Sequence, residues 1–114
     1  MADRRAVLVK LWDALNRRDL AAAGECLHPD VDWHDLIDNV RLHGREAVRD
    51  FWTRAFAIIK TNSTLLGVEE DSQGRIAVTV LHTVRSLEDR PWTEETVTHI
   101  YSFRDGLISR MDLE

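Results

Sequence analysis

The hydrophobic period of this sequence changes once, close to Thr61, and this change restricts the fold more than any single motif. Before Thr61, apolar residues recur every three or four positions, as in amphipathic helices. After it, apolar and polar residues alternate in four segments separated by "SQG", "LEDRP" and "DG", which favour turns. The pattern predicts helices followed by an antiparallel meander, an α+β fold in which the helices cover one face of the sheet. A chain of 114 residues suits one such domain, spanning residues 1–114.

Three helices and one strand are expected in the first sixty residues. The first helix fits the opening fifteen residues, with Asp3 as its cap, and a second short helix begins at Asp19 and is stopped by Pro29. The segment "DVDWHDL" then has the alternation of a strand. The third helix follows Gly44 in "REAVRDFWTRAFAII", whose apolar stripe gives the clearest helix prediction in the chain.

Composition excludes several classes of partner. A formal net charge of −5 with scattered Lys and Arg argues against nucleic acid or an anionic membrane as the main partner. Cys26 is the only cysteine, so no intrachain disulfide can form, and the opening residues, interrupted by Lys10 and Asp13, resemble neither a signal sequence nor a membrane span. We therefore expect a cytoplasmic protein. Because Gly-rich phosphate loops, paired-Cys motifs and nucleophile elbows are absent from the sequence, we expect no cofactor and no metal.

Alternation also predicts which strand residues face the interior. Two stripes are almost entirely apolar: Ile76, Val78, Val80, His82 and Val84 on one strand, and Val97, His99, Tyr101 and Phe103 on the next. On the last strand two sets are possible, and the less charged one is preferred. The preferred set is Leu107, Ser109, Met111 and Leu113; the other is Ile108, Arg110 and Asp112.

Three polar side chains interrupt the inward stripes, namely Asp35, His82 and His99, with Asp35 on the same face as Val31 and Trp33. In one interpretation each histidine is a hydrogen-bonded wall residue and Asp35 caps the end of a strand. In the other, the three converge in an apolar pocket. There a carboxylate can accept a proton near neutral pH, and an imidazole can donate a hydrogen bond or move the proton itself.

Three motifs, "LWDALNRRDLAAAGECLHPDVDWHD", "LHGREAVRDFW" and "HIYSFRDGLISRMD", together cover nearly the whole chain. In their order and spacing they resemble the nuclear-transport-factor-2-like superfamily, in particular its SnoaL-like branch. The resemblance implies a cone-shaped, curved, mixed or antiparallel sheet with three helices packed on its concave face, a cystatin-like α+β roll with a deep apolar pocket. This superfamily contains isomerases, cyclases, dehydratases, hydrolases and non-catalytic binding proteins, so the fold does not determine the function.

Comparison with the steroid-isomerase members implies roles for single residues. Asp35 falls at their proton-shuttling base, His99 at their second oxyanion-binding acid, and Leu11 at the tyrosine that donates the principal hydrogen bond to the oxyanion. Since a leucine cannot donate this bond, the ketosteroid reaction itself is not expected, but proton transfer on another carbonyl compound is compatible. Polyketide cyclases place an essential acid or base just beyond the last strand. Asp112 is the nearest carboxylate here, and the preferred alternation points it outward.

Two functions are left open. One is a cofactor-free enzyme of the isomerase or cyclase class for a small apolar carbonyl compound, with Asp35 and His99 as catalytic residues. The other is a non-catalytic protein that binds a small apolar ligand or dimerises. The expected pocket wall is Leu11, Trp33, Phe51, Trp52, Phe56, Val80, His82, Val97, Tyr101 and Met111.

The outward face of the sheet predicts a homodimer. Residues 79–85 and 96–100 present threonines and aliphatic side chains there, with few like charges. Such a face is too apolar to be purely solvated and too polar to be a core. It suits a symmetric dimer packed sheet on sheet.

Overall fold

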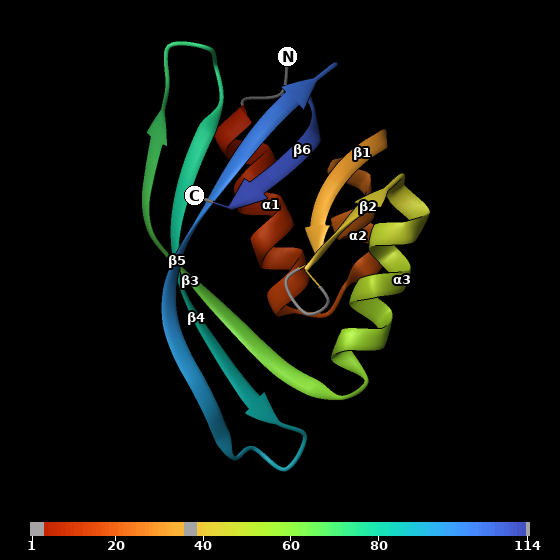
Figure 1. Cartoon of the computed structure of the whole chain (residues 1–114), viewed down its shortest axis with the longest axis vertical. Coiled ribbons are helices and arrows are strands. Elements are labelled where there is room, and N and C mark those ends of the chain that lie inside the picture. Colours follow the sequence, from red (N-terminus) through yellow and green to blue (C-terminus); the bar gives the residue numbers. More distant parts are fainter. Residues whose placement is uncertain (1–3, 36–38, 114) are drawn as a thin grey trace.

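A computed structural model of the chain describes residues 4–35 and 39–113. Within these ranges the chain forms three helices and six strands (Figure 1). In chain order they are α1 (Arg4–Asn16), α2 (Leu20–Glu25), β1 (Leu27–Asp35), β2 (Val40–His43), α3 (Arg45–Phe56), β3 (Ile59–Glu70), β4 (Ile76–Ser86), β5 (Pro91–Arg104) and β6 (Leu107–Leu113). The predicted helix cap at Asp3 lies outside the described residues.

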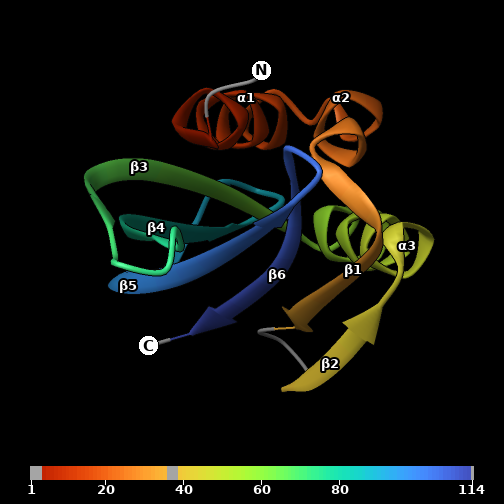
Figure 2. The ribbon, with the colours of Figure 1, turned by 90° about the horizontal axis from the view of Figure 1, so that it is seen from above.

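The strands form one curved sheet in the order β2-β1-β6-β5-β4-β3. β1 pairs with β6 in parallel, and the other neighbours pair antiparallel, so the sheet is mixed. Seen from above, the sheet curves around the interior, with α1 above β3–β5 and α3 beside β1 (Figure 2). The predicted α+β class with a curved sheet is confirmed.

The helices bury the apolar faces that their spacing predicts. On α1 the buried residues are Val7, Leu8, Leu11, Trp12, Ala14 and Leu15. The Asp19 side chain caps α2 by accepting a hydrogen bond from the Ala22 backbone N–H at 3.1 Å. No helix in the described part of the chain is long and apolar enough to cross a membrane.

The prediction that Pro29 stops the second helix was wrong, because α2 already ends at Glu25 and Pro29 lies inside β1. A strand tolerates proline where no ladder N–H is needed. The β1–β6 pairing is irregular between Leu27 and Asp32, which is the stretch that contains Pro29.

One missed strand and one helix end also differ from the sequence prediction. β2 was not predicted, because it is only four residues long and mostly exposed. The third helix was predicted to run through Ile59, whereas α3 ends at Phe56 and Ile59 begins β3. β-Branched residues at Ile58, Ile59 and Thr61 favour the extended chain over another helical turn.

The alternation predicted for the last strand holds only in part. Met111 is buried as expected, but Ile108 is buried as well, whereas Leu107 is only half-buried. The pairing of β5 with β6 shifts between Ser102 and Phe103, which leaves Ser109 as an extra residue on β6. Such a bulge reverses the alternation on either side of it, and sequence period alone does not reveal it.

The core lies between the helices and the concave face of the sheet. One apolar cluster joins Leu8 and Leu11 of α1, Trp52 of α3, and Val78 and Tyr101 of the sheet. All of these residues are at most 4% exposed. The cavity described below lies within this cluster.

The core predicts a position-specific stability effect along α1. Leu11 is fully buried, so Leu11→Ala removes packed methyl groups and leaves a void, which we expect to cost about 2–5 kcal/mol of unfolding free energy. Val9, on the same helix, is 57% exposed, and Val9→Ala should change stability by less than about 0.5 kcal/mol. Urea denaturation of both variants measures this difference, and equal losses would contradict the assigned helix face.

Candidate functional site

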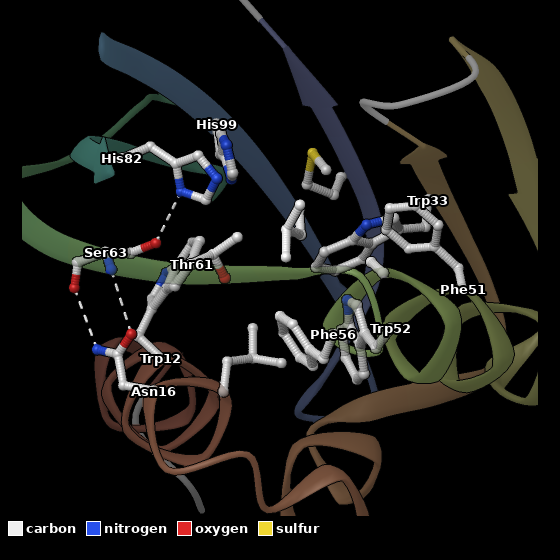
Figure 3. Close-up of a pocket in the computed structure, with 14 residues that line it drawn as sticks. Trp12, Asn16, Trp33, Phe51, Trp52, Phe56, Thr61, Ser63, His82 and His99 are labelled. Atoms are coloured by element: carbon white, nitrogen blue, oxygen red, sulfur yellow. Dashed lines mark hydrogen bonds between the residues drawn. The ribbon is translucent and has the colours of Figure 1, made fainter. Parts of the chain in front are cut away.

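A cavity of about 110 Å³ lies between α1, α3 and the concave face of the sheet (Figure 3). Helices contribute Trp12, Leu15, Asn16, Phe51, Trp52, Ala55 and Phe56. Strands contribute Trp33, Ile59, Thr61, Ser63, His82, His99 and Met111. The site therefore combines residues from both ends of the sequence.

Aromatic rings give the cavity a rigid apolar wall. Trp33 of β1 and Trp52 of α3 meet edge to face, with ring centroids 5.6 Å apart and planes at 90°. The Trp33 ring also lies 6.1 Å from Tyr101, and Trp12 lies 5.5 Å from His99. Edge-to-face and tilted contacts of this kind stabilise the packing beyond the buried area alone. A ligand in this cavity would meet mainly carbon.

His99 brings a hydrogen-bonding group onto this wall. Its side chain is 3% exposed, and its Nδ1 lies 3.0 Å from the hydroxyl of Tyr101, which is completely buried. We assign the hydroxyl proton to this bond, because a proton on Nδ1 would leave both the Tyr101 hydroxyl hydrogen and Nε2 without a partner among the described residues. This assignment places the imidazole proton on Nε2. His99 Nε2 has no hydrogen-bond partner among the described residues. The site thus contains a buried donor without an acceptor.

The environment keeps His99 and Tyr101 neutral. Burial, with a smaller effect of the His82 and His34 imidazoles, lowers the pKa of His99 from 6.5 to about 4. Burial also raises the pKa of Tyr101, and the nearby Trp12 indole N–H only partly offsets this rise. That indole N–H makes no hydrogen bond of standard geometry among the described residues. At neutral pH His99 is therefore an uncharged donor.

A second polar group on the cavity wall joins His82 to Ser63. The His82 Nδ1 atom lies 3.0 Å from Ser63 Oγ, and the two residues are direct partners in the β3–β4 pairing. Burial lowers the pKa of His82, and the negative charge of Glu95 opposes this effect. Asn16 of α1 holds the Ser63 backbone through two hydrogen bonds, of 3.1 and 3.2 Å (Figure 3).

Arg18 fixes one edge of the cavity. Its guanidinium lies 4.3 Å from the centre of the Phe56 ring and donates hydrogen bonds to the backbone oxygens of Leu15 and Thr61. All three contacted residues line the cavity, so Arg18 ties the turn after α1 to the end of α3 and the start of β3. Arg18 itself has a positive φ of 62°, which marks this turn as tightly constrained.

Asp35 lies at the end of β1, is 2% exposed and shares the inward face with Trp33. β1 and β6 are parallel and Trp33 pairs with Met111, so Asp35 lies level with Leu113, which pairs with His99. Asp35 is therefore two strands away from His99 on the same face of the sheet. Two strand spacings correspond to roughly 10 Å between backbones. Asp35 is not among the residues that line the cavity.

The predicted wall residues fall into two groups. Those that line the cavity are Trp33, Phe51, Trp52, Phe56, His82 and Met111, together with His99. Those outside its lining are Leu11, Val80, Val97 and Tyr101. Leu11, Val80 and Tyr101 are fully buried in the core, and Val97 packs against it.

Sequence reasoning missed the contribution of β3. Ile59, Thr61 and Ser63 line the cavity, and their alternation could have placed them on one face. The helix residues Leu15, Asn16 and Ala55 were also missed, and Trp12 was assigned to the core alone. No periodic signal separates a cavity wall from a core on an apolar helix stripe.

Asp112 lies outside the cavity, as the preferred alternation predicted. Its carboxylate pairs with Arg41 at 3.2 Å and with Arg110 at 2.8 Å. Both arginines also contact Asp32, which gives a four-residue ion-pair network on the outward face of β1, β2 and β6. In residues 4–35 and 39–113 no group of three His, Cys, Asp or Glu side chains is arranged to hold a metal ion.

Comparisons with known proteins agree with this architecture. A model of the family described as SnoaL-like domain matches residues 8–111. No curated protein shows a significant match to the sequence.

Solved structures extend the likeness in the fold. A putative polyketide cyclase from Sinorhizobium meliloti is 21% identical, with 95% of this chain and 93% of that chain covered and a TM-score of 0.81. An NTF2-like protein from Burkholderia pseudomallei is also 21% identical, with 100% of this chain and 91% of that chain covered and a TM-score of 0.85. A Mycobacterium tuberculosis protein in complex with estradiol-17beta-hemisuccinate is 18% identical, with 94% of this chain and 88% of that chain covered and a TM-score of 0.82. At these identities the likeness shows the fold alone.

The low pKa of His99 predicts how stability depends on pH. His99 binds a proton near pH 6.5 in the unfolded chain and near pH 4 in the folded chain. Its contribution to the free energy of unfolding is therefore present above pH 6.5 and is lost as the pH falls toward 4. Between pH 7 and pH 5 this loss amounts to about 2 kcal/mol. Urea denaturation at both pH values should show that His99→Phe reduces the pH dependence by this amount.

His43→Gln is the control, because it replaces an exposed histidine that lies outside the cavity. An NMR titration in which the His99 ring protonates near pH 6.5 would contradict the assigned environment.

Proposed function

Because this chain belongs to the SnoaL-like domain family, we propose that it binds a small apolar carbonyl compound and moves a proton at the carbon beside the carbonyl, without a cofactor. The observation that carries the proposal is His99, a buried neutral imidazole on the largely aromatic side of the cavity, whose Nε2 has no hydrogen-bond partner among the described residues and is assigned the ring proton. A ligand carbonyl oxygen is the acceptor that this donor lacks. Apolar rings around the donor favour a ligand with few other polar groups.

His99 would contribute more to the reaction than to ground-state binding. When a proton leaves the carbon beside a carbonyl, negative charge develops on the carbonyl oxygen. A fixed donor in a water-poor site stabilises this charge more strongly than it stabilises the neutral carbonyl. Because His99 is uncharged, it can remain buried on the apolar wall before the ligand arrives.

Asp35 is the proposed base. It shares the inward face with His99 and lies two residues after Trp33 on β1, and Trp33 is part of the cavity wall. The roughly 10 Å between the Asp35 and His99 backbones would allow a single ring to lie over β6 within reach of both side chains. In this role Asp35 takes the proton from carbon and returns it to the same or a neighbouring carbon.

The cavity volume restricts the size of the ligand. An enclosed cavity of about 150 Å³ is known to admit benzene, and the cavity here is smaller, about 110 Å³, but partly open, so one ring that extends into the opening is the upper limit. We therefore propose a one-ring ketone or a compound of similar size as the ligand. A steroid, such as the estradiol ester bound by the Mycobacterium tuberculosis relative, would require the walls to move apart.

A second candidate function is ligand binding without catalysis. It is favoured by Asp35 being outside the lining of the cavity, and by Leu11, which offers no second donor to an oxyanion. The cavity and the His99 donor are common to both candidates. Only the proton-transfer function requires Asp35.

Deuterium incorporation distinguishes the two candidates. With cyclohexanone in D₂O, the wild-type protein should exchange the hydrogens beside the carbonyl faster than buffer, as seen by ¹H NMR. Asp35→Asn should reduce this exchange to the buffer rate, because the amide cannot accept the proton. Binding of cyclohexanone, measured by tryptophan fluorescence, should persist in Asp35→Asn.

Asp30→Asn is the matched control, because Asp30 is an exposed carboxylate on the same strand. Exchange should be unaffected by this change. Binding without exchange in the wild type would establish the non-catalytic function, and exchange that survives Asp35→Asn would remove Asp35 as the base. If cyclohexanone does not bind at all, both candidates fail for one-ring ketones.

We further propose that two copies pair through the outward face of the sheet. Leu81, Thr79 and Thr98 on this face are half-buried in the single chain. Sedimentation velocity at micromolar concentration should give the mass of two chains. Leu81→Glu should give the mass of one chain, because like charges would meet across the two-fold axis. Val9→Glu, on the exposed face of α1, should leave the dimer intact, and a wild-type monomer would contradict the proposal.

A further inference from the structure

We infer that Ser63 and His82 form a nucleophile–base pair that accepts acyl groups from small apolar esters, with His99 as the oxyanion donor. Ser63 Oγ and His82 Nδ1 are 3.0 Å apart, and both side chains line the cavity. A hydroxyl bonded to a neutral imidazole is the arrangement that activates serine for attack on a carbonyl. This activity rests on the cavity and the His99 donor of the proposed function, but Ser63 and His82 take the place of Asp35 in the chemistry.

The sheet aligns the pair without loops. Ser63 and His82 are direct partners in the antiparallel pairing of β3 with β4, so their side chains leave the sheet next to each other on the same face. Glu95 is the next partner of His82 across the sheet, on β5. Its charge favours the imidazolium that forms when His82 takes the serine proton.

Asn16 fixes the position of the serine. β3 is an edge strand, so on one side its backbone groups have no neighbouring strand. At Ser63 the Asn16 side chain replaces this strand: its Nδ2 donates to the Ser63 oxygen at 3.1 Å, and its Oδ1 accepts from the Ser63 N–H at 3.2 Å. A two-point contact of this kind holds the Cα, and with it the hydroxyl, against the cavity. Figure 3 shows this chain of contacts from Asn16 through Ser63 to His82.

His99 supplies the remaining group. Its ring lines the same cavity, beside His82 (Figure 3), and its Nε2, to which the ring proton is assigned, has no hydrogen-bond partner in the part of the chain that the structure describes. An ester carbonyl that accepts a hydrogen bond from His99 would present its carbon to the side of the cavity where Ser63 lies. The oxygen would then be stabilised as it becomes negatively charged.

The reaction balances without a further reactant except water. Ser63 Oγ forms a bond to the ester carbon while its proton moves to His82 Nδ1. The tetrahedral intermediate collapses, the carbon–oxygen bond to the alcohol breaks, and the alcohol leaves with the proton from His82. Water then attacks the acyl-serine carbon and gives one proton to His82. As the bond from this carbon to Ser63 Oγ breaks, His82 returns that proton to Ser63 Oγ and the carboxylic acid leaves.

The experiment uses p-nitrophenyl acetate with the full-length chain. We expect a burst of p-nitrophenolate, a mass increase of one acetyl group, and peptide mapping that places this acetyl group on Ser63. Ser63→Ala should abolish both the burst and the adduct. His82→Gln should slow acylation by about a hundredfold, because the serine loses its base.

Two further variants make the result specific. Ser63→Cys should form an acetyl thioester at the same position, which shows that the site and not the hydroxyl alone directs the reaction. Thr64→Ala removes the exposed neighbouring hydroxyl on the opposite face of β3 and should leave the burst unchanged.

An acetyl group found only on lysine or histidine, or a burst that survives Ser63→Ala, would overturn the inference. So would the absence of any burst in the wild type. Deuterium incorporation reports on the proposed function and acetylation of Ser63 reports on this inference, so either can fail alone.

Discussion

The hydrogen bond between the Tyr101 hydroxyl and His99 Nδ1 is the interaction on which the site depends. Both side chains are nearly inaccessible to solvent. Removing either one would therefore leave the other as a buried polar group without a hydrogen bond, which lowers the free energy of unfolding. Because the hydroxyl donates its proton to Nδ1, the imidazole proton remains on Nε2. The bond thus stabilises the core and, with this assignment, leaves Nε2 as a buried donor without a hydrogen-bond partner among the described residues.

The surrounding fold makes this donor effective. Trp12, Trp33 and Trp52 approach from two helices and one strand and give the cavity wall its aromatic surface. Arg18 holds the far edge through Phe56 and the Thr61 backbone, so the cavity is formed by contacts between elements distant in sequence. Beside these apolar rings, one neutral donor acts more strongly on a ligand oxygen than it would in water.

Much of this arrangement follows from the sequence. The α1 stripe, the inward faces of β4 and β5, and the Asp19 cap depend on local periodicity and capping chemistry, and these were predicted. Three features were not predicted, for different reasons: the Ser109 bulge depends on the exact β5–β6 register, β2 is too short and exposed to show a period, and the parallel β1–β6 pair joins strands distant in sequence. The Ser63–His82 contact also required the β3–β4 register, although both residues were visible in the sequence. Asp35 and His99 were predicted on a common inward face, and the strand pairings are consistent with it.

The tautomer of His99 is the most direct test of this account. ¹⁵N NMR of the His99 ring at neutral pH distinguishes a protonated from an unprotonated nitrogen at each position. We predict that Nε2 carries the proton and that Nδ1 accepts the bond from Tyr101. A proton on Nδ1 would turn Nε2 into an acceptor, and His99 would then offer no donor to a carbonyl oxygen, which would contradict the central claim.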